Sequence, residues 1–149
     1  MIQAIFKTNK DTSGLVLRLI LALVFFPHGA QKVLGWFGGY GFTGSLQYFQ
    51  GQGIPTIFVL LLFAAEFLGP IALVLGLFTR VSALGIGVAM SVAALVHLPN
   101  GLFMNWFGNQ QGEGYEFHLL AIAIAAALVI KGGGLASLDG VLAEQKRTA

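Results

Sequence analysis

The sequence predicts an all-α integral membrane protein, and three observations support this fold class. Hydrophobic residues make up 56% of the 149 positions. Only 9% of the residues are charged, whereas about a quarter are charged in an average soluble protein. Long apolar runs alternate with glycine-rich connections along the chain. Because a soluble domain of this length needs a charged surface that this composition does not supply, we expect most of the chain to lie in lipid.

Four apolar runs have about the 17–25 residues that a helix needs to cross the hydrocarbon layer. They cover roughly residues 14–34, 56–78, 81–98 and 116–131. The connection between the second and third runs is very short, so these two runs are expected to form an antiparallel hairpin. The fourth run is rich in alanine and spans comfortably only if its first turn is helical. We therefore predict a four-helix bundle that forms a single domain over residues 1–149.

Small residues and one connection add detail to this bundle. Glycine and alanine recur in the second, third and fourth runs, where they allow helices to approach closely in lipid. In the first connection, the segment FTGSLQYFQ has Thr43 as a candidate N-cap and apolar residues at helical spacing. We expect a short helix there, lying in the membrane interface and held by its aromatic side chains.

The distribution of basic residues predicts the orientation. With four spans, one side carries most of the basic residues, namely Lys7, Lys10, Arg80, Lys131, Lys146 and Arg147. The other side has Lys32 alone. The positive-inside rule then places both termini in the cytoplasm. A cleaved signal peptide is disfavoured, because the first run has no small-x-small cleavage site and three further runs follow it.

Composition also limits the function. The net charge of +2 is too small to indicate a nucleic-acid partner. The chain has no cysteine, which excludes disulfides, thiolate chemistry and cysteine-ligated metal centres. The glycine run at 132–134 follows a helix rather than a strand, which is wrong for a phosphate-binding turn.

Ionisable groups within the apolar runs are expected only where they have a structural or functional role, because inserting each into the membrane costs about 2.5–3.5 kcal/mol on insertion scales. In the first run, His28, Gln31 and Lys32 share one helical face, just after Pro27, which is expected to kink the helix. Glu66 lies near the centre of the second run. The alternatives to a functional site are a snorkelling Lys32 and a buried ion pair that fixes helix register. Arg18, near the inner end, is expected to form a structural ion pair.

Further polar groups are predicted at the same outer level. His97 ends the third run, and the connection after it delivers Asn105, Trp106, Glu116 and His118. Convergence of so many ionisable groups at one depth predicts a polar cavity that opens outward. The aromatic residues of this connection also fit an interfacial belt.

The chemistry that fits this cavity best is quinone chemistry. A quinone needs aromatic walls, donors for its carbonyl oxygens and a carboxylate that exchanges protons. A haem or metal site is less favoured, since no pair of candidate ligands stands on adjacent helical turns, and no metal ligands are assigned. We assign catalytic roles to Glu66, Glu116 and Lys32. We assign ligand binding to His28, Gln31, His97, Asn105, Trp106 and His118.

Three sequence blocks resemble a known family. They are R-x9-H-G-x2-K from Arg18 to Lys32, E-x2-G-x6-G-L-x-T-R from Glu66 to Arg80, and GEGYEFHLL at 112–120. Together the blocks resemble the DoxX family of small bacterial membrane proteins, over about residues 12–140. The resemblance implies a four-helix protein of the bacterial inner membrane that is linked to redox homeostasis and to membrane-associated oxidoreductase assemblies.

The resemblance and the polar cluster together favour a quinone-linked redox protein or subunit. Two other functions stay open. One is a non-catalytic membrane scaffold for soluble oxidoreductases, which would explain why the chain has no redox cofactor motif of its own. The other is a small transporter or permeation pathway. The expected partners are the lipid bilayer, a soluble or membrane oxidoreductase and further copies of the chain.

Overall fold

The computed structural model describes residues 5–148, and every element of regular secondary structure in that range is a helix. The all-α prediction is therefore confirmed. Three helical segments are long and apolar enough to cross a membrane, and they cover Thr12–Leu34, Thr56–Leu75 and Thr79–Asn100. The helix α7, Glu116–Lys131, has 16 residues and is about 24 Å long at 1.5 Å per residue. This is shorter than the hydrocarbon layer, which is about 30 Å thick.

The first of these segments is one continuous helix, α2, over Thr12–Leu34. It begins at the N-cap Asp11, whose carboxylate accepts a hydrogen bond from the Gly14 N–H. It ends at Gly35, which has a φ of 73° and provides the left-handed turn that stops a helix. The helix passes through Pro27.

The second segment is divided into α4 (Thr56–Phe63), the π-helical turn η2 (Ala64–Leu68) and α5 (Gly69–Leu75). In an α-helix, the N–H of residue 70 would donate to the carbonyl of Glu66, but Pro70 has no N–H and its ring would clash there. The ladder widens instead, so the Gly69 N–H donates to the carbonyl of Ala64, five residues earlier. Glu66 therefore lies in the centre of a π-turn.

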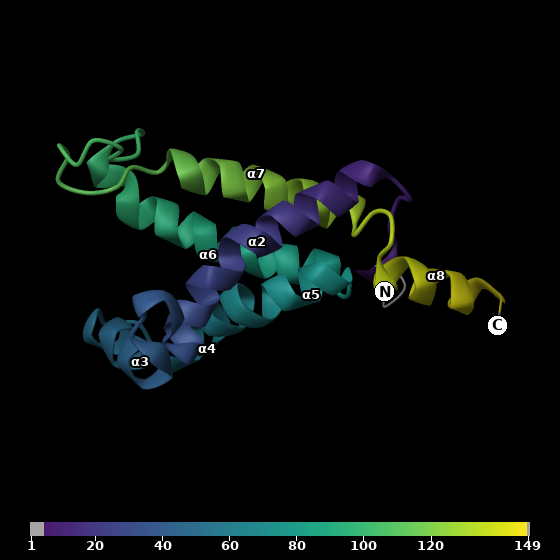
Figure 1. The fold of residues 1–149 in the computed structure, drawn as a ribbon, viewed down its shortest axis with the longest axis horizontal. Coiled ribbons are helices and arrows are strands. Elements are labelled where there is room, and N and C mark those ends of the chain that lie inside the picture. The colour runs from purple at the N-terminus through teal and green to yellow at the C-terminus, as the bar shows by residue number, and fades with distance from the viewer. Residues whose placement is uncertain (1–4, 149) are drawn as a thin grey trace.

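The third segment continues from α6 (Thr79–His97) into the short 3-10 helix η3 (Leu98–Asn100). Helix α6 lies beside α7, and α2 packs against α5 and η2 (Figure 1). Helices α2, α5, α6 and α7 contribute to one buried apolar cluster, which includes Leu21, Phe25, Leu73, Ile86 and Leu128. The small residues act as expected, because a Cβ on Gly87 would touch Ala125 at 3.3 Å.

The short helix predicted in the first connection is present as α3 (Gly41–Gly51), after the 3-10 turn η1 (Trp36–Gly38). The prediction of Thr43 as its N-cap was wrong, because the helix begins two residues earlier. Glycines before α3 reverse the chain soon after α2 ends, and Gly38 and Gly41 have φ values of 76° and 67°. Phe42 and Phe49 of α3 pack on Phe63 of α4, with ring centroids 5.4 and 6.5 Å apart.

The two ends of the chain lie at the end of the molecule far from α3 (Figure 1). Here Arg18 is 2% exposed, and its guanidinium donates to carbonyl oxygens of two segments. The acceptors are Leu73, Val74, Gly133, Leu135 and Ala136, at 2.6–3.3 Å. Arg18 was expected in an ion pair. Within residues 5–148, backbone carbonyls hold it instead, and they join α2 to the ends of α5 and α7.

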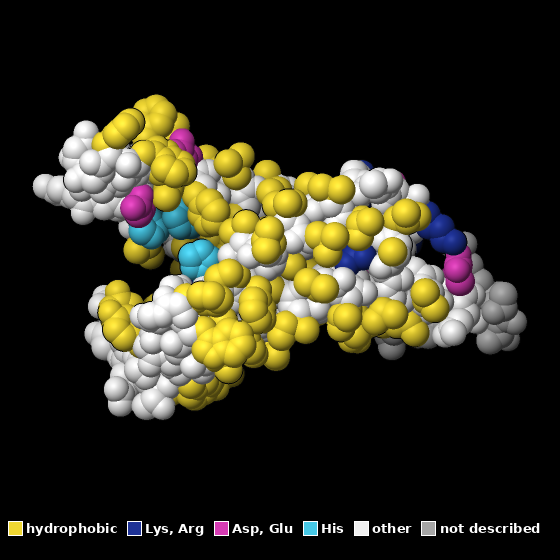
Figure 2. Space-filling model, in the orientation of Figure 1, with side chains coloured by type: hydrophobic (Ala, Val, Ile, Leu, Met, Phe, Trp, Pro, Cys, Tyr) yellow, Lys and Arg dark blue, Asp and Glu magenta, His cyan; other side chains and the backbone are white. Residues whose placement is uncertain are grey.

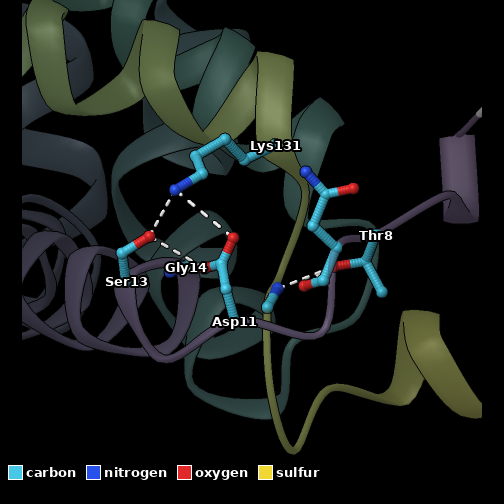
Figure 3. A network of polar contacts seen from close by, with 7 residues as sticks. Thr8, Asp11, Ser13, Gly14 and Lys131 are labelled. Carbon is cyan, nitrogen blue, oxygen red and sulfur yellow. Dashed lines mark hydrogen bonds and ion pairs between the residues drawn. The ribbon is translucent and has the colours of Figure 1, made fainter.

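Further polar contacts close the same end. Asp139, at the start of α8 (Leu138–Thr148), accepts hydrogen bonds from the Phe78 and Thr79 N–H groups, both at 2.8 Å, and so caps α6. Figure 3 shows Lys131, the last residue of α7, reaching the N-cap of α2, with its Nζ 3.3 Å from the Asp11 carboxylate. The Gly134 N–H donates to Thr8 Oγ1 at 2.7 Å. This end is therefore tied together by hydrogen bonds.

Candidate functional site

The opposite end of the molecule is open. A notch separates two parts of the chain, which we call the α3 lobe (residues 35–54) and the loop lobe (residues 98–115). Figure 2 shows the notch between these lobes, with histidine side chains along it. The chain has three histidines, His28, His97 and His118. The notch therefore lies where the sequence predicts the outer polar cavity.

An ion pair lies on the α2 side of this end. Lys32 Nζ is 2.5 Å from Glu66 Oε2, and the Glu66 side chain is only 6% exposed. The contact joins two charges at close distance without an aligned hydrogen bond, because Oε2 has no hydrogen-bond partner in the described part of the chain. The sequence placed Lys32 and Glu66 in one cavity, and the structure brings them into contact.

Two backbone features bring Glu66 to Lys32. The π-turn changes the direction in which its residues project from the helix, and π-turns frequently occur at functional sites. Gly29 of α2 lies directly on this turn. A Cβ on Gly29 would be 2.0 Å from the Glu66 carbonyl oxygen and 2.7 Å from Phe67 Cα. Only glycine permits this approach of α2 to the π-turn.

The other polar residues of α2 differ in their roles. His28 is exposed at this end, one turn before Lys32, and Lys32 Nζ lies 3.5 Å from its carbonyl oxygen. Gln31 donates from Nε2 to the Phe37 carbonyl at 3.2 Å. Gln31 therefore fastens the α3 lobe to α2, a contact that the shared helical face did not reveal.

A pair of stacked histidines lies where α6 ends and α7 begins. The rings of His97 and His118 are 4.8 Å apart and inclined by 28°. His97 Nδ1 is 2.9 Å from the Glu113 carbonyl oxygen. His118 is 8% exposed, and its buried Nδ1 has no hydrogen-bond partner within the described range. The pair therefore holds a nitrogen whose hydrogen-bonding capacity is unused.

A row of aromatic rings connects this pair to α2. The row runs from His118 through Phe117 and Phe25 to His28, with ring centroids 5.8, 6.3 and 6.3 Å apart. Sequence reasoning missed Phe25 and Phe117 as members of the site. The position of Phe117 between Glu116 and His118 was the available signal. The row thus runs from the histidine pair through the buried Phe25 to His28, which lies one turn before Lys32.

The remaining predicted residues organise the loop lobe. Glu116 Oε1 accepts from the Met104 N–H at 2.8 Å and from Trp106 Nε1 at 3.4 Å. Asn105 exchanges two hydrogen bonds with the backbone of Gln110, and its own N–H donates to the Glu113 carboxylate. The structure does not bring Glu116, Asn105 or Trp106 to the Lys32–Glu66 pair. Within residues 5–148 there is also no cluster of three or more histidine, aspartate or glutamate side chains of the kind that holds a metal ion.

Comparison with known proteins identifies the family. The DoxX family profile matches residues 13–98, a range that contains the Lys32–Glu66 pair, Gly29 and His97. This chain belongs to the DoxX family. The resemblance found in the sequence is therefore confirmed. Family membership and the apolar helices together establish a membrane protein that contacts lipid.

Two relatives show how far the similarity extends. The chain is 26% identical over 137 residues to "Putative oxidoreductase CatD" of Bacillus subtilis (strain 168), covering 92% of each chain. It is 30% identical over 92 residues to "Inner membrane protein YqjF" of Escherichia coli (strain K12), covering 61% of this DoxX protein and 66% of the relative. No solved structure gives a significant match.

Proposed function

We propose that this DoxX protein binds the headgroup of a quinone or quinol in the notch, as part of a membrane oxidoreductase system. The observation that carries the proposal is the buried Lys32–Glu66 pair beside His28. It puts a cation in contact with a carboxylate, with an exposed imidazole one helical turn from the cation, at the open end of an apolar protein. The similarity to CatD, whose printed name is that of an oxidoreductase, supports a redox setting.

The chemistry follows from what each group offers. Reduction of a quinone to a quinol takes up two electrons and two protons. Lys32 and His28 donate hydrogen bonds to carbonyl oxygens of the headgroup, and the positive charge of Lys32 stabilises the negative charge that grows there on reduction. Glu66 exchanges protons with the bound ligand. The electrons come from a partner oxidoreductase, since the sequence has no cysteine and no redox cofactor motif.

The histidine pair serves the opposite end of the same headgroup. Phe117, half-buried beside His118, supplies an apolar ring at this side of the site, while Phe25 is 1% exposed and lies in the core behind it. A headgroup bound in the notch presents one carbonyl oxygen to Lys32 and His28 and the other to the histidine pair. Glu116, which the sequence suggested as a second proton carrier, orders the loop lobe in this arrangement and acts only indirectly.

The proposal includes an arrangement in the membrane. Helices α2, α4 to α5, α6 and α7 form a four-span bundle, with α7 extended toward the lipid surface by the residues before Glu116. Both termini lie in the cytoplasm of a bacterial cell, and the notch opens at the outer face. The excess of basic residues at the end that holds the termini supports this orientation.

Binding of a ubiquinone or menaquinone analogue to the protein in lipid nanodiscs tests the function. We expect saturable binding by the wild type and at least tenfold weaker binding by Glu66→Gln and by Lys32→Gln. The matched control is Lys10→Gln, because Lys10 also forms an ion pair with a glutamate, Glu144, but exposed and at the other end. Absence of binding by the wild type, or equal weakening by the control, would contradict the proposal.

A scaffold function is the second candidate, and the need for an external electron donor favours it. In that case the protein docks a soluble oxidoreductase at the membrane and the notch is not used. Affinity capture from the native membrane distinguishes the two, since a scaffold should retain its oxidoreductase equally in wild type and Glu66→Gln. Loss of the partner enzyme in Glu66→Gln alone would count against a simple scaffold.

A further inference from the structure

The two lobes beside the notch carry most of the exposed aromatic side chains at this end. From their chemistry we infer that both lobes rest in the lipid headgroup layer, so that the notch opens to the membrane surface rather than to bulk water. Its ligand is then an amphiphile that arrives from the bilayer. This inference rests on the proposed membrane spans and specifies how the proposed ligand reaches its site.

The α3 lobe presents aromatic rings outward. Trp36 is 53% exposed and Tyr40 is 79% exposed, and the lobe also exposes Phe37 and Tyr48. Tyr40 and Tyr48 stack at 6.4 Å on one side of α3, while Phe42 and Phe49 pack inward on Phe63. The lobe is thus fixed to the span α4 on one side and offers tyrosine and tryptophan on the other. These are the residues enriched where membrane meets water.

The loop lobe does the same on the other side of the notch. Trp106 is 79% exposed and Phe107 is 90% exposed, and Leu102 and Phe103 are exposed beside them. The backbone behind these side chains is held by carboxylates, since Glu116 accepts from the Met104 N–H and Glu113 from the Asn105 N–H. The loop therefore holds its aromatic residues outward by specific bonds.

The distribution of charge indicates whether the exposed surface of the lobes lies against lipid headgroups or in bulk water. No charged residue occurs between Lys32 and Glu66 or between Arg80 and Glu113, so the whole α3 lobe is uncharged. In the loop lobe, the carboxylate of Glu113 is engaged by a backbone N–H group, as is that of Glu116 just behind the lobe. An exposed surface with many aromatic rings and a single carboxylate, that of Glu113, is costly in water and stable in the headgroup layer.

The position of the lobes agrees with this environment. The α3 lobe lies between the end of α2 and the start of α4, and the loop lobe follows α6, so both stand at the ends of candidate spans. Figure 2 shows apolar side chains on both lobes and the histidines between them. The notch therefore opens at the depth where the two lobes are anchored. Trp106, which the sequence analysis assigned to ligand binding, is assigned to the membrane surface instead.

The two tryptophans of the chain allow each lobe to be tested by itself, because Trp36 lies on the α3 lobe and Trp106 on the loop lobe. The variants Trp106→Phe and Trp36→Phe each leave one fluorescent reporter. Both are reconstituted, without added ligand, in vesicles whose phospholipids are brominated near the headgroup or deep in the acyl chain. We expect shallow bromines to quench each tryptophan at least twofold more strongly than deep bromines, and aqueous iodide to quench weakly.

A third reporter controls for water exposure. Val141 on α8 is half exposed at the far end of the molecule, and Val141→Trp in a background without Trp36 and Trp106 should be quenched by iodide and not by bromines. If iodide quenches either lobe as strongly as this control, the inference is overturned. If iodide quenches a lobe strongly and quinone still binds, the proposed function stands and only this inference fails. If shallow bromines quench both lobes as expected and no quinone binds, only the proposed function is rejected.

Discussion

At the residue scale, the Lys32–Glu66 pair is the feature whose desolvation has the largest cost. Transfer of both charges out of water costs several kcal/mol per ion, and their mutual attraction offsets this cost only while both are present. Removal of one partner leaves a buried charge without compensation. Removal of both leaves a neutral site that packs without penalty. Stability and ligand binding should therefore respond differently to single and double substitution.

We predict that Lys32→Met lowers the free energy of unfolding by about 3 kcal/mol, because Glu66 is then buried without a cation. The double variant Lys32→Met with Glu66→Gln should recover most of this stability, yet bind no quinone. Thermal unfolding in detergent gives the stabilities, and the nanodisc assay gives the binding. Additive losses in the double variant would show that the two side chains are not coupled.

A second residue-scale prediction concerns the N-cap of α2. The backbone N–H of Gly14 and the hydroxyl of Ser13 hold the pKa of Asp11 below its usual value of 3.8, with a further contribution from Lys131. A lowered pKa means that the ionised carboxylate stabilises the fold. This stabilisation is complete above the usual pKa and disappears as the pH falls below 3.8 through the lower folded-state pKa.

The variant Asp11→Asn keeps the capping oxygen and removes the charge. We expect it to melt at a lower temperature than the wild type at pH 7, and the difference to shrink as the pH falls below 3.8 and the wild-type carboxyl becomes protonated as well. Melting curves of both proteins across this range provide the measurement. A constant difference at all pH values would mean that cap geometry, not charge, accounts for the effect.

The site residues show how far sequence reasoning reaches at this scale. Periodicity placed His28 and Lys32 on one face of a helix, and the cost of a buried charge singled out Glu66. Both arguments use only local spacing and solvation, so they work without a structure. Gln31, Asn105 and Trp106 were assigned to the ligand, and Glu116 to catalysis, by position alone. Gln31, Asn105 and Glu116 instead hydrogen-bond to loop backbone, and Trp106 donates to the Glu116 carboxylate, which no spacing rule could have predicted.

At the element scale, the irregular second span decides the geometry. A regular helix through Glu66 and Pro70 would leave one carbonyl without its partner and force a clash at the proline ring. In the π-turn the Gly69 N–H donates to the Ala64 carbonyl instead, and Glu66 meets Lys32 of α2. The sequence predicted a span here but not its π-turn. The second run is apolar on nearly every face, so it has no periodicity that one inserted residue would disturb, and proline alone does not distinguish a kink from a π-turn.

The contact between α2 and this π-turn gives the third prediction. A Cβ at residue 29 would lie 2.0 Å from the Glu66 carbonyl oxygen, so Gly29→Ala must push the two segments apart. Overpacking of this kind costs about 1–3 kcal/mol, which exceeds the gain of up to about 1 kcal/mol that alanine offers over glycine in a helix. We therefore expect lower stability and a weakened ion pair, measured as reduced melting temperature and reduced quinone binding.

The control for this variant is Gly51→Ala at the end of α3. A Cβ there meets no atom within 4 Å, and its backbone is not left-handed. This substitution should leave both stability and binding unchanged. If Gly29→Ala behaves like the control, then α2 and the π-turn are not in the close contact described.

At the scale of the whole molecule, the two ends have opposite characters. One end is closed by buried Arg18, by the Asp139 cap and by the glycine run at 132–134, where a Cβ on Gly133 would be 2.7 Å from Thr79 Oγ1. The other end is divided by the notch. A closed end fixes the relative positions of α2, α5, α6 and α7, and the open end can then hold a site between them. The sequence predicted that His28, Lys32, Glu66, His97 and His118 lie at one depth, and the structure brings Lys32 to Glu66 and His97 to His118.

The number of spans is the property of the whole molecule that most needs measurement, because three helical segments meet the length of a span and α7 is shorter. The native chain has no cysteine, so single cysteines report their side of the membrane cleanly. We predict that Gln110→Cys in the loop lobe reacts with an impermeant maleimide in intact cells. Lys7→Cys and Val141→Cys, which flank the closed end, should react only after the membrane is permeabilised.

If Lys7→Cys and Val141→Cys react on opposite sides, α7 does not cross the bilayer and the four-span arrangement is wrong. If both react in intact cells, the four spans stand but the orientation is reversed, and the notch then faces the cytoplasm.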